Sequence, residues 1–396
     1  MRSIRFPAWA ALALACLAWG CVGGAPKAPV LAPVSDRAAA SLARSLDPAT
    51  QDLASWRDLE PGLKLSLDYL TSKPADGVAV AGPPAVTWGR VRATAQRLLE
   101  LLPQLDADPG LLAREFAWAE LAPRPLLTGY YAPILDASPV ATPEFPYPLY
   151  ALPPDVQTVD LGRFHPRWDG QTLVYRVQGG RIEPYFDRAA IDGQGALAGQ
   201  GLELAWVRDR YDAFVLQVQG SGLLRFPDGA LRHALYAGKN GRQYVSLGKA
   251  MAQAGLIPLE QVTMSSIREY LDAHPDQEQA LLDKNPSYVF FRLADSGPLG
   301  AMGRLLTPRV SVATDPRVLP LGSVLALAAD LPPGAPGTAD EAGRALAGLA
   351  LAQDTGGAIK QAHLDYFCGS GPEAGALAGE LKARARVWLL LVREEP

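Results

Sequence analysis

Prolines recur so often in the middle of this chain that they limit the length of any helix there. Between residues 126 and 154 they follow one another every few positions. A proline inside a helix removes a backbone hydrogen bond and clashes with the preceding turn. We therefore expect this part of the chain to form short strands and turns.

Periodic patterns elsewhere predict both kinds of secondary structure. Short runs rich in β-branched and aromatic residues predict strands at residues 172–177, 202–207, 214–219, 289–293 and 387–392. Helical spacing or helix-forming composition predicts helices at residues 38–46, 88–102, 109–121 and 264–282. The 396 residues leave room for about two domains.

The N-terminus has the pattern of an export signal. Arg2 and Arg5 precede an apolar segment, residues 8–19, that is too short to remain as a membrane-spanning helix. The sequence LAWGC around Cys21 resembles a bacterial lipoprotein signal, in which the cysteine becomes the lipidated N-terminus. Small residues at Ala18 and Gly20 also allow ordinary secretory cleavage and a soluble periplasmic product. Residues 25–33 are predicted to be a tether.

Cysteine usage and charge exclude several classes of protein. If Cys16 leaves with the signal and Cys21 carries lipid, Cys368 is alone and no intramolecular disulfide forms. The formal charge of −4 becomes −6 without Arg2 and Arg5, because the signal contains no acidic residue. Such a chain has no general attraction to nucleic acid.

Common catalytic motifs are also missing. The chain contains no phosphate-binding loop and no Gly-x-Ser-x-Gly nucleophile elbow. Its four histidines show no zinc-binding spacing, so we expect neither a metal nor a cofactor.

Two aspartates near the C-terminus are the first candidates for catalysis. In the segment LAQDTGGAIKQAHLDYF, Asp354 ends an apolar run and Asp365 lies among apolar and aromatic residues. Poor solvation raises the pKa of a carboxyl and suits it to general acid catalysis at a glycosidic oxygen. The alternative is structural, with Asp354 fixing a turn and Asp365 pairing locally.

Polar groups in the middle of the chain suit sugar recognition. Stacked aromatic rings, planar amides and cations are the usual partners of sugar rings and hydroxyls. The predicted contacts are Tyr130, Tyr131, Gln217, Gln219, Ser221, Tyr236, Lys239, Asn240 and His363. Gln217 and Gln219 are expected on one side of a strand. The structural alternative is a polar sheet face and a turn.

Taken in order, several motifs resemble those of the membrane-bound lytic murein transglycosylase A family. The motifs are LTGYYAP, LQVQGSG, YAGKNGRQYVSLGK, NPSYVFF and AQDTGGAIKQAHLDYFCGSGPEAG. The resemblance implies a mainly β fold with N-terminal helices. In that fold a three-aspartate double-psi β-barrel is split by an inserted β domain, with a large groove between them. It implies a signal peptide at 1–20 and a lipidated N-terminus and tether at 21–34. A helical segment with the first part of the barrel follows at 35–129, then the inserted β domain at 130–295 and the three-aspartate barrel at 296–396.

The resemblance also assigns roles to three aspartates. By similarity, Asp365 is the single catalytic acid/base, whereas Asp354 and Asp315 support the site. Lytic transglycosylases cleave the β-1,4 bond between N-acetylmuramic acid and N-acetylglucosamine, and the muramic C6 hydroxyl attacks C1 to give a 1,6-anhydro end. An internal nucleophile has a high effective molarity, so one carboxyl is sufficient.

This reading implies partners and a location. The expected partner is the glycan strand of peptidoglycan, and cell-wall synthesis or degradation complexes are further possible partners. The membrane is contacted only through the lipid, at the periplasmic face of the outer membrane. Two other functions remain open: a hydrolase of related barrel fold that uses a second carboxylate, and a non-catalytic wall-binding lipoprotein.

Overall fold

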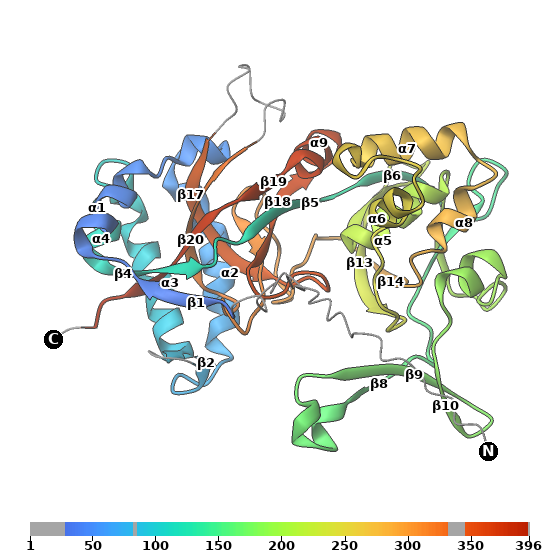
Figure 1. The fold of residues 1–396 in the computed structure, drawn as a ribbon, viewed down its shortest axis with the longest axis horizontal. Coiled ribbons are helices and arrows are strands. Elements are labelled where there is room, and N and C mark those ends of the chain that lie inside the picture. Colours follow the sequence, from blue (N-terminus) through green and yellow to red (C-terminus); the bar gives the residue numbers. More distant parts are fainter. Residues whose placement is uncertain (1–27, 82–84, 332–344, 395–396) are drawn as a thin grey trace, which may run out of the picture.

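The computed structural model describes residues 28–81, 85–331 and 345–394 (Figure 1). The predicted signal peptide, Cys21 and the first part of the predicted tether lie outside these residues. Figure 1 shows two lobes, one holding the N-terminal helices and the C-terminal strands and the other holding the middle of the chain.

In the first lobe, nine strands of the described residues form one mixed sheet. Their order is β1 (Val30–Pro33), β4 (Phe116–Ala122), β20 (Arg386–Val392), β16 (Val324–Asp330), β17 (Ala345–Asp354), β15 (Ser311–Ala313), β18 (His363–Ser370), β5 (Leu126–Ala132) and β19 (Lys382–Arg384). The pairs β15–β17 and β18–β5 are parallel, and the other neighbouring pairs are antiparallel. A small hairpin, β2 (Val78–Val80) with β3 (Val86–Thr87), lies beside the sheet.

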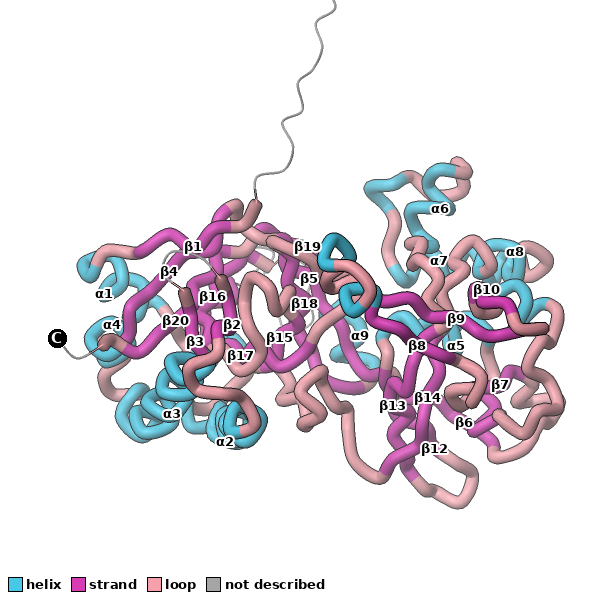
Figure 2. The backbone as a smooth tube through the Cα atoms, turned by 90° about the horizontal axis from the view of Figure 1, so that it is seen from below, coloured by secondary structure: helices cyan, strands magenta, loops and turns pink. Residues whose placement is uncertain are grey.

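Helices pack on this sheet through apolar stripes. They are α1 (Asp36–Ser45), α2 (Glu60–Thr71), α3 (Trp88–Leu105), α4 (Leu111–Glu115) and α9 (Pro372–Glu380). Figure 2 shows α2 and α3 together on one side of the sheet. Thr87 caps α3 by accepting a hydrogen bond from the Arg90 amide, and Leu98 and Leu102 are buried. Each fully buried leucine stabilises the fold by about 1.5–3 kcal/mol.

The second lobe is built on a six-stranded sheet among the described residues. Its order is β14 (Val289–Ala294), β13 (Leu231–Lys239), β12 (Ser221–Arg225), β6 (Ile134–Ser138), β11 (Glu203–Val207) and β7 (Tyr147–Tyr150). Four helices accompany it here: α5 (Arg210–Gln219), α6 (Leu247–Gln253), α7 (Met264–Ala273) and α8 (Glu278–Leu282). A separate ribbon of β10 (Arg181–Pro184), β9 (Thr172–Gln178) and β8 (Gln157–Asp160) extends from this lobe (Figure 1).

Most of the predicted elements are confirmed. The helices predicted at 38–46 and 88–102 are α1 and α3, and strands are found at 172–177, 202–207, 289–293 and 387–392. Residues 264–282 form two helices, α7 and α8, with a break between them.

Three predictions need correction. Residues 214–219 belong to helix α5 rather than to a strand, because Asp209 caps the helix start and Gly220 ends it with a left-handed backbone. Only the short helix α4 forms within 109–121, and the remainder is strand β4. The last four residues of the predicted tether form β1, which pairs with β4.

The fold is therefore mixed helix and sheet, with mostly sheet. The described residues contain no helix that combines the length and the apolar character needed to cross a bilayer.

Candidate active site

One row of side chains runs from the central strand of the nine-stranded sheet to one of its edges. Ala313 on β15 is in register with Asp354 on β17 and with Asp365 on β18, and Asp365 is in register with Thr128 on β5. Lys382 on β19 lies opposite Thr128. Register partners point to the same face of a sheet. The two aspartates therefore share a face across one intervening strand, with Cα atoms about 10 Å apart.

Asp365 is the carboxyl best suited to hold a proton near neutrality. It is partly buried, and the Thr128 hydroxyl lies 2.6 Å from its Oδ1. Burial raises the pKa of Asp365 to about 6; the hydrogen bond from Thr128 lowers it and the charge of Asp354 raises it further. The predicted apolar setting is present, because Tyr130 and Phe367 belong to the apolar cluster beside it. A carboxyl of this pKa can act as acid and then as base near neutral pH.

Asp354 is held by three donors at the end of β17. The Tyr130 hydroxyl donates to its Oδ2 at 2.8 Å, and the amides of Thr355 and Ala301 donate to its Oδ1 at 2.8 and 2.9 Å. Burial raises the pKa of Asp354, whereas these hydrogen bonds lower it. With three of its roughly four lone-pair sites occupied in this way, Asp354 fixes the positions of β5 and of the turn after β17.

Asp315 serves as an ionised structural anchor. Its side chain is 3% exposed and accepts two hydrogen bonds from the Arg317 guanidinium, at 3.0 and 2.8 Å. The amide of Gln361 donates to it at 2.9 Å. Burial tends to raise the pKa of Asp315, but the hydrogen bonds from Arg317 and Gln361 outweigh it and hold the pKa at about 2. Asp315 thus joins its own turn to the loop that leads into β18.

Thr128 links His363 to Asp365. Its Oγ1 lies 3.0 Å from Nε2 of His363 as well as 2.6 Å from Asp365, and Nδ1 of His363 lies 3.3 Å from the Ala358 carbonyl oxygen. Burial lowers the pKa of His363, and the hydrogen bond to Ala358 raises it. Sequence reasoning missed Thr128, although it lies inside the motif LTGYYAP, because only the strand register reveals its neighbours.

The predicted tyrosine pair is divided between two tasks. Tyr130 is 9% exposed, its ring lies 5.2 Å from that of Phe367, and its hydroxyl binds Asp354. Burial, followed by the neighbouring Asp354, holds the pKa of Tyr130 well above its usual value. Tyr131 packs where the cores of the two lobes meet, and its amide donates to Oε1 of Gln219 at 3.0 Å.

The amides of α5 do not share one open face, contrary to the prediction. Gln217 is 5% exposed, and its Oε1 accepts a hydrogen bond from Arg188 at 2.7 Å. Gln219 is partly buried at the helix end and holds β5 through Tyr131. Ser221, the first residue of β12, is partly exposed. Gln217 therefore serves the fold, whereas Gln219 and Ser221 lie where the second lobe meets β5.

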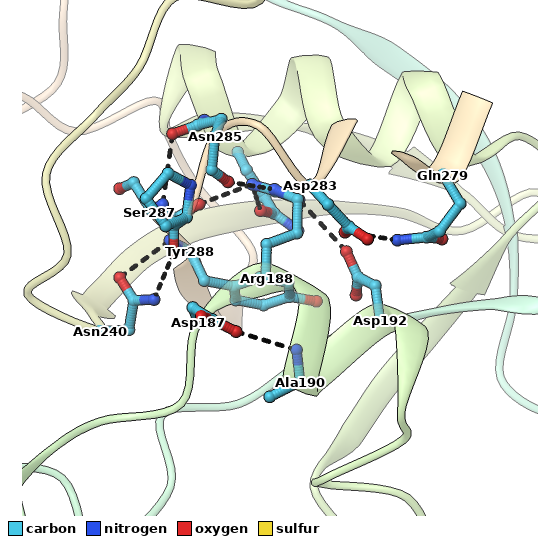
Figure 3. Close-up of polar contacts among 12 residues, drawn as sticks. Asp187, Arg188, Ala190, Asp192, Asn240, Gln279, Asp283, Asn285, Ser287 and Tyr288 are labelled. Carbon is cyan, nitrogen blue, oxygen red and sulfur yellow. Dashed lines mark hydrogen bonds and ion pairs between the residues drawn. The ribbon is translucent and has the colours of Figure 1, made fainter. Parts of the chain in front are cut away.

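Asn240 is a structural residue, which corrects the prediction that it binds sugar. It is 1% exposed and donates to the carbonyls of Phe186 and Pro286, while its Oδ1 accepts from the Tyr288 amide at 2.9 Å. Figure 3 shows it beside the buried Arg188 network. By contrast, Tyr236 and Lys239 on β13 expose their side chains.

The Arg188 network was not predicted from the sequence. Arg188 is 2% exposed and bonds to Asp192, Gln217 and the carbonyls of Asn285 and Ser287 (Figure 3). A buried guanidinium needs this many acceptors to offset its lost hydration. The network ties α5 to the segment before β14.

Within the described ranges no group of three or more His, Cys, Asp or Glu side chains is placed to hold a metal.

Family models match two parts of this chain. A model described as the MltA specific insert domain matches residues 126–292, and a model described as the 3D domain matches residues 310–391. The membrane-bound lytic murein transglycosylase A of Vibrio cholerae is 35% identical over 297 residues, which cover 74% of this chain and 73% of the relative. The Escherichia coli protein of the same name is 36% identical over 266 residues, covering 66% and 64%.

Solved structures agree with these matches. A membrane-bound lytic murein transglycosylase from Agrobacterium tumefaciens is 30% identical, with a TM-score of 0.75 over 92% of this chain and 98% of the other. MltA from Neisseria gonorrhoeae is 28% identical, with a TM-score of 0.69 over 94% and 93%. Escherichia coli MltA with bound chitohexaose is 28% identical, with a TM-score of 0.59 over 92% of each chain.

Proposed function

The chain belongs to the membrane-bound lytic murein transglycosylase A family and is a peptidoglycan-cleaving lyase; we propose that Asp365 alone supplies its acid and base catalysis. One contrast carries this proposal. The carboxyl of Asp365 has a pKa of about 6, whereas the other two aspartates are held in structural contacts. Asp354 accepts three hydrogen bonds and Asp315 is locked to Arg317.

The proposed reaction proceeds without water. Protonated Asp365 gives its proton to the glycosidic oxygen that joins N-acetylmuramic acid to N-acetylglucosamine, and the electrons of the C1–O bond leave with that oxygen. The C6 hydroxyl of the muramic acid attacks C1 and passes its proton to the carboxylate. The product carries a 1,6-anhydromuramic end, and Asp365 is protonated again. A hydrolase would require a second carboxylate free to act as nucleophile or base, and the contacts of Asp354 and Asp315 disfavour that role.

We further propose that the nine-stranded sheet contains the double-psi β-barrel of the three-aspartate domain, although its end strands, β1 and β19, do not pair with each other in the described residues. The parallel pairs β15–β17 and β18–β5 within an otherwise antiparallel sheet support this topology. The proposed boundaries are those expected from the resemblance, an insert at 130–295 between barrel segments 35–129 and 296–396, except that β5 belongs to the nine-stranded sheet as far as Ala132. The structure of the Escherichia coli relative with bound chitohexaose supports glycan binding by this chain, and we propose that the glycan lies in a groove between the two parts. Gln219, Ser221, Tyr236 and Lys239 are the proposed contacts from the insert.

The proposed setting is the periplasmic face of the outer membrane. The relatives are named as membrane-bound proteins. In this chain, a lipidated Cys21 would provide the attachment to the membrane. The alternative is a soluble periplasmic protein cut after Gly20. Complexes that build or degrade the cell wall are proposed as partners.

The decisive experiment is product analysis after digestion of purified sacculi. Asp365→Asn is expected to lower anhydromuropeptide release at least about 10² to 10⁴-fold, the usual contribution of general acid–base catalysis. It should still bind chitohexaose, because the substitution changes only the proton-bearing group. Wild-type products should carry ends lighter by one water than hydrolysis products.

The matched control is Asp36→Asn, which changes an aspartate 81% exposed in an ion pair with Arg393. Its product yield should equal that of the wild type. Near wild-type turnover by Asp365→Asn would remove the assignment. Reducing ends in place of anhydro ends would favour the hydrolase, and binding without any release would favour a wall-binding protein.

A further inference from the structure

The contacts around Thr128 restrict where the hydrogens of this site can lie. The Ala358 carbonyl oxygen can only accept, so Nδ1 of a neutral His363 carries its ring hydrogen. Nε2 is then an acceptor, and the Thr128 hydroxyl 3.0 Å away can donate to it. The same hydroxyl can instead donate to Asp365 Oδ1 at 2.6 Å when that carboxyl is ionised, and the Leu364 carbonyl oxygen is a more distant acceptor at 3.4 Å. A hydroxyl has one hydrogen, so while Thr128 donates to His363 its oxygen can only accept from Asp365.

This arrangement is complete only when Asp365 is protonated. Oδ1 of Asp365 lies 2.6 Å from Thr128 Oγ1, a distance typical of an O–H···O hydrogen bond. A proton on Oδ1 donates to Thr128, Thr128 donates to His363, and His363 donates to Ala358. When Asp365 is ionised, it competes with His363 for the single hydrogen of Thr128.

We propose that His363 draws the single hydrogen of Thr128 toward its Nε2, which opposes the donation from Thr128 that favours ionised Asp365, so that this hydrogen-bond relay favours the acid form of Asp365 between turnovers. The inference rests on the proposed function of Asp365 and deepens it: the two residues are positioning residues that act on the carboxyl, and His363 is assigned here rather than to sugar binding. The carboxylate left after the first proton transfer lacks a full set of donors. It is therefore a stronger base toward the C6 hydroxyl, and accepting that proton restores the relay.

Other ionisable groups lie on the elements that neighbour the relay. They are Tyr130 on β5, Asp354 at the end of β17, Cys368 on β18, Lys382 and Arg384 on β19, Glu373 and Glu380 on α9, and Asp315, Arg317 and Lys360 beside the loop before β18. These groups are unchanged in the variants below, so their fields act equally on each protein compared.

The test is the alkaline limb of the pH–rate profile at limiting glycan, which reports the pKa of the free enzyme's acid. In His363→Leu, Thr128 is free to donate to the carboxylate, so the limb should move about one pH unit lower. In Thr128→Val, the carboxylate loses its donor and the limb should move higher. The double variant should match Thr128→Val, because His363 acts only through Thr128.

His363→Gln is the conservative control. The glutamine oxygen can occupy the place of Nε2 and accept from Thr128, so the limb should return toward its wild-type position. If His363 binds sugar instead, His363→Leu will raise KM and leave the limb in place, which would overturn the relay. An upward shift in His363→Leu, or additive shifts in the double variant, would overturn it as well.

Failure of the relay can be separated from failure of the proposed function. If wild-type protein releases no anhydro ends, the proposed function is wrong whatever the limbs show. If anhydro ends form but the shifts are absent, only the relay is wrong. Should Thr128→Val fail to fold, the opposite behaviour of His363→Leu and His363→Gln still decides the question.

Discussion

At the scale of one residue, the environment of Asp365 opposes folding at neutral pH. Its pKa is about 6 in the folded protein, above the ordinary value of 3.8, so the folded state binds this proton more tightly than the unfolded state. The contribution of Asp365 to stability therefore falls as pH rises from 3.8 through 6. Asp365→Asn removes this cost, and above pH 6 it should be more stable than the wild type by roughly 1–3 kcal/mol.

Chemical unfolding at pH 4 and pH 8 measures this difference. The gain of Asp365→Asn should be largest at pH 8 and approach zero at pH 4, because the wild-type carboxyl is then protonated in the folded state. Asp36→Asn, with its exposed ion pair, should stay within about 0.5 kcal/mol of the wild type at both values. A gain at pH 4 equal to that at pH 8 would show that the raised pKa is not its cause.

The sequence indicates the chemistry of single residues better than it indicates which residues lie beside them in the fold. Asp354 and Asp365 stand out because apolar residues flank them, and the structure places both on one face of the sheet. Asn240 also stands out in its glycine-rich loop, yet its amide holds buried backbone groups together. Thr128 has no local signal at all, because its partners lie more than 230 residues away in sequence.

At the scale of elements, close packing of α9 on β5 holds the site in position. A Cβ atom at Gly129 would lie 2.8 Å from Cα of Ala378 on α9 and 3.1 Å from Sγ of Cys368. Backbone cannot give way cheaply at that distance, so Gly129→Ala must push β5 and α9 apart. We expect a loss of about 1–3 kcal/mol in unfolding free energy and a lower kcat, because Thr128 and Tyr130 flank the shifted residue.

Gly379→Ala in the same helix is the matched control. A Cβ atom there meets nothing within 4 Å, and alanine is the better helix former. Its unfolding free energy should rise by about 0.5–1 kcal/mol with unchanged kcat. Thermal unfolding and turnover measured together on both variants test the idea, and equal effects of the two substitutions would contradict it.

The misassigned helix α5 shows why some elements escape sequence reasoning. Alternation of apolar residues with Gln217 and Gln219 predicts a strand, but this helix buries Phe214, Val215 and Leu216 on several sides. A helix buried all round loses the periodic pattern that identifies helices. The informative signals were its ends, Asp209 as N-cap and Gly220 as C-cap, which the alternation concealed.

At the scale of the whole molecule, β5 and β14 connect the two lobes. Residues 126–132 form a strand of the nine-stranded sheet, and the chain then enters the six-stranded sheet at β6 and remains in the second lobe until β14 ends. Local patterns predicted a few of these strands, at 202–207, 289–293 and 387–392, but not their order, because the nine-stranded sheet combines strands from residue 30 to residue 392. Ordered motifs spread along the chain were what indicated the insertion.

The position of β1 bears on the proposed membrane anchor. Because β1 pairs with β4 from Val30 onward, only the chain between Cys21 and Val30 is left to connect a lipid to the fold. Nine residues span at most about 30 Å when fully extended. A lipidated enzyme would therefore work close to the membrane and reach only nearby glycan strands.

Cys21→Ser tests this arrangement. If Cys21 carries the lipid, the substitution should move the protein from the membrane fraction to the soluble periplasm, because a full lipid anchor contributes about 0.8 kcal/mol per buried CH₂. Release of anhydromuropeptides from purified sacculi should remain at the wild-type rate, since Cys21 lies far in sequence from the aspartate row. Fractionation of cells producing either protein gives the answer. Wild-type protein already in the soluble fraction would instead favour ordinary signal cleavage after Gly20, for which Trp19 and the small residues around it leave room.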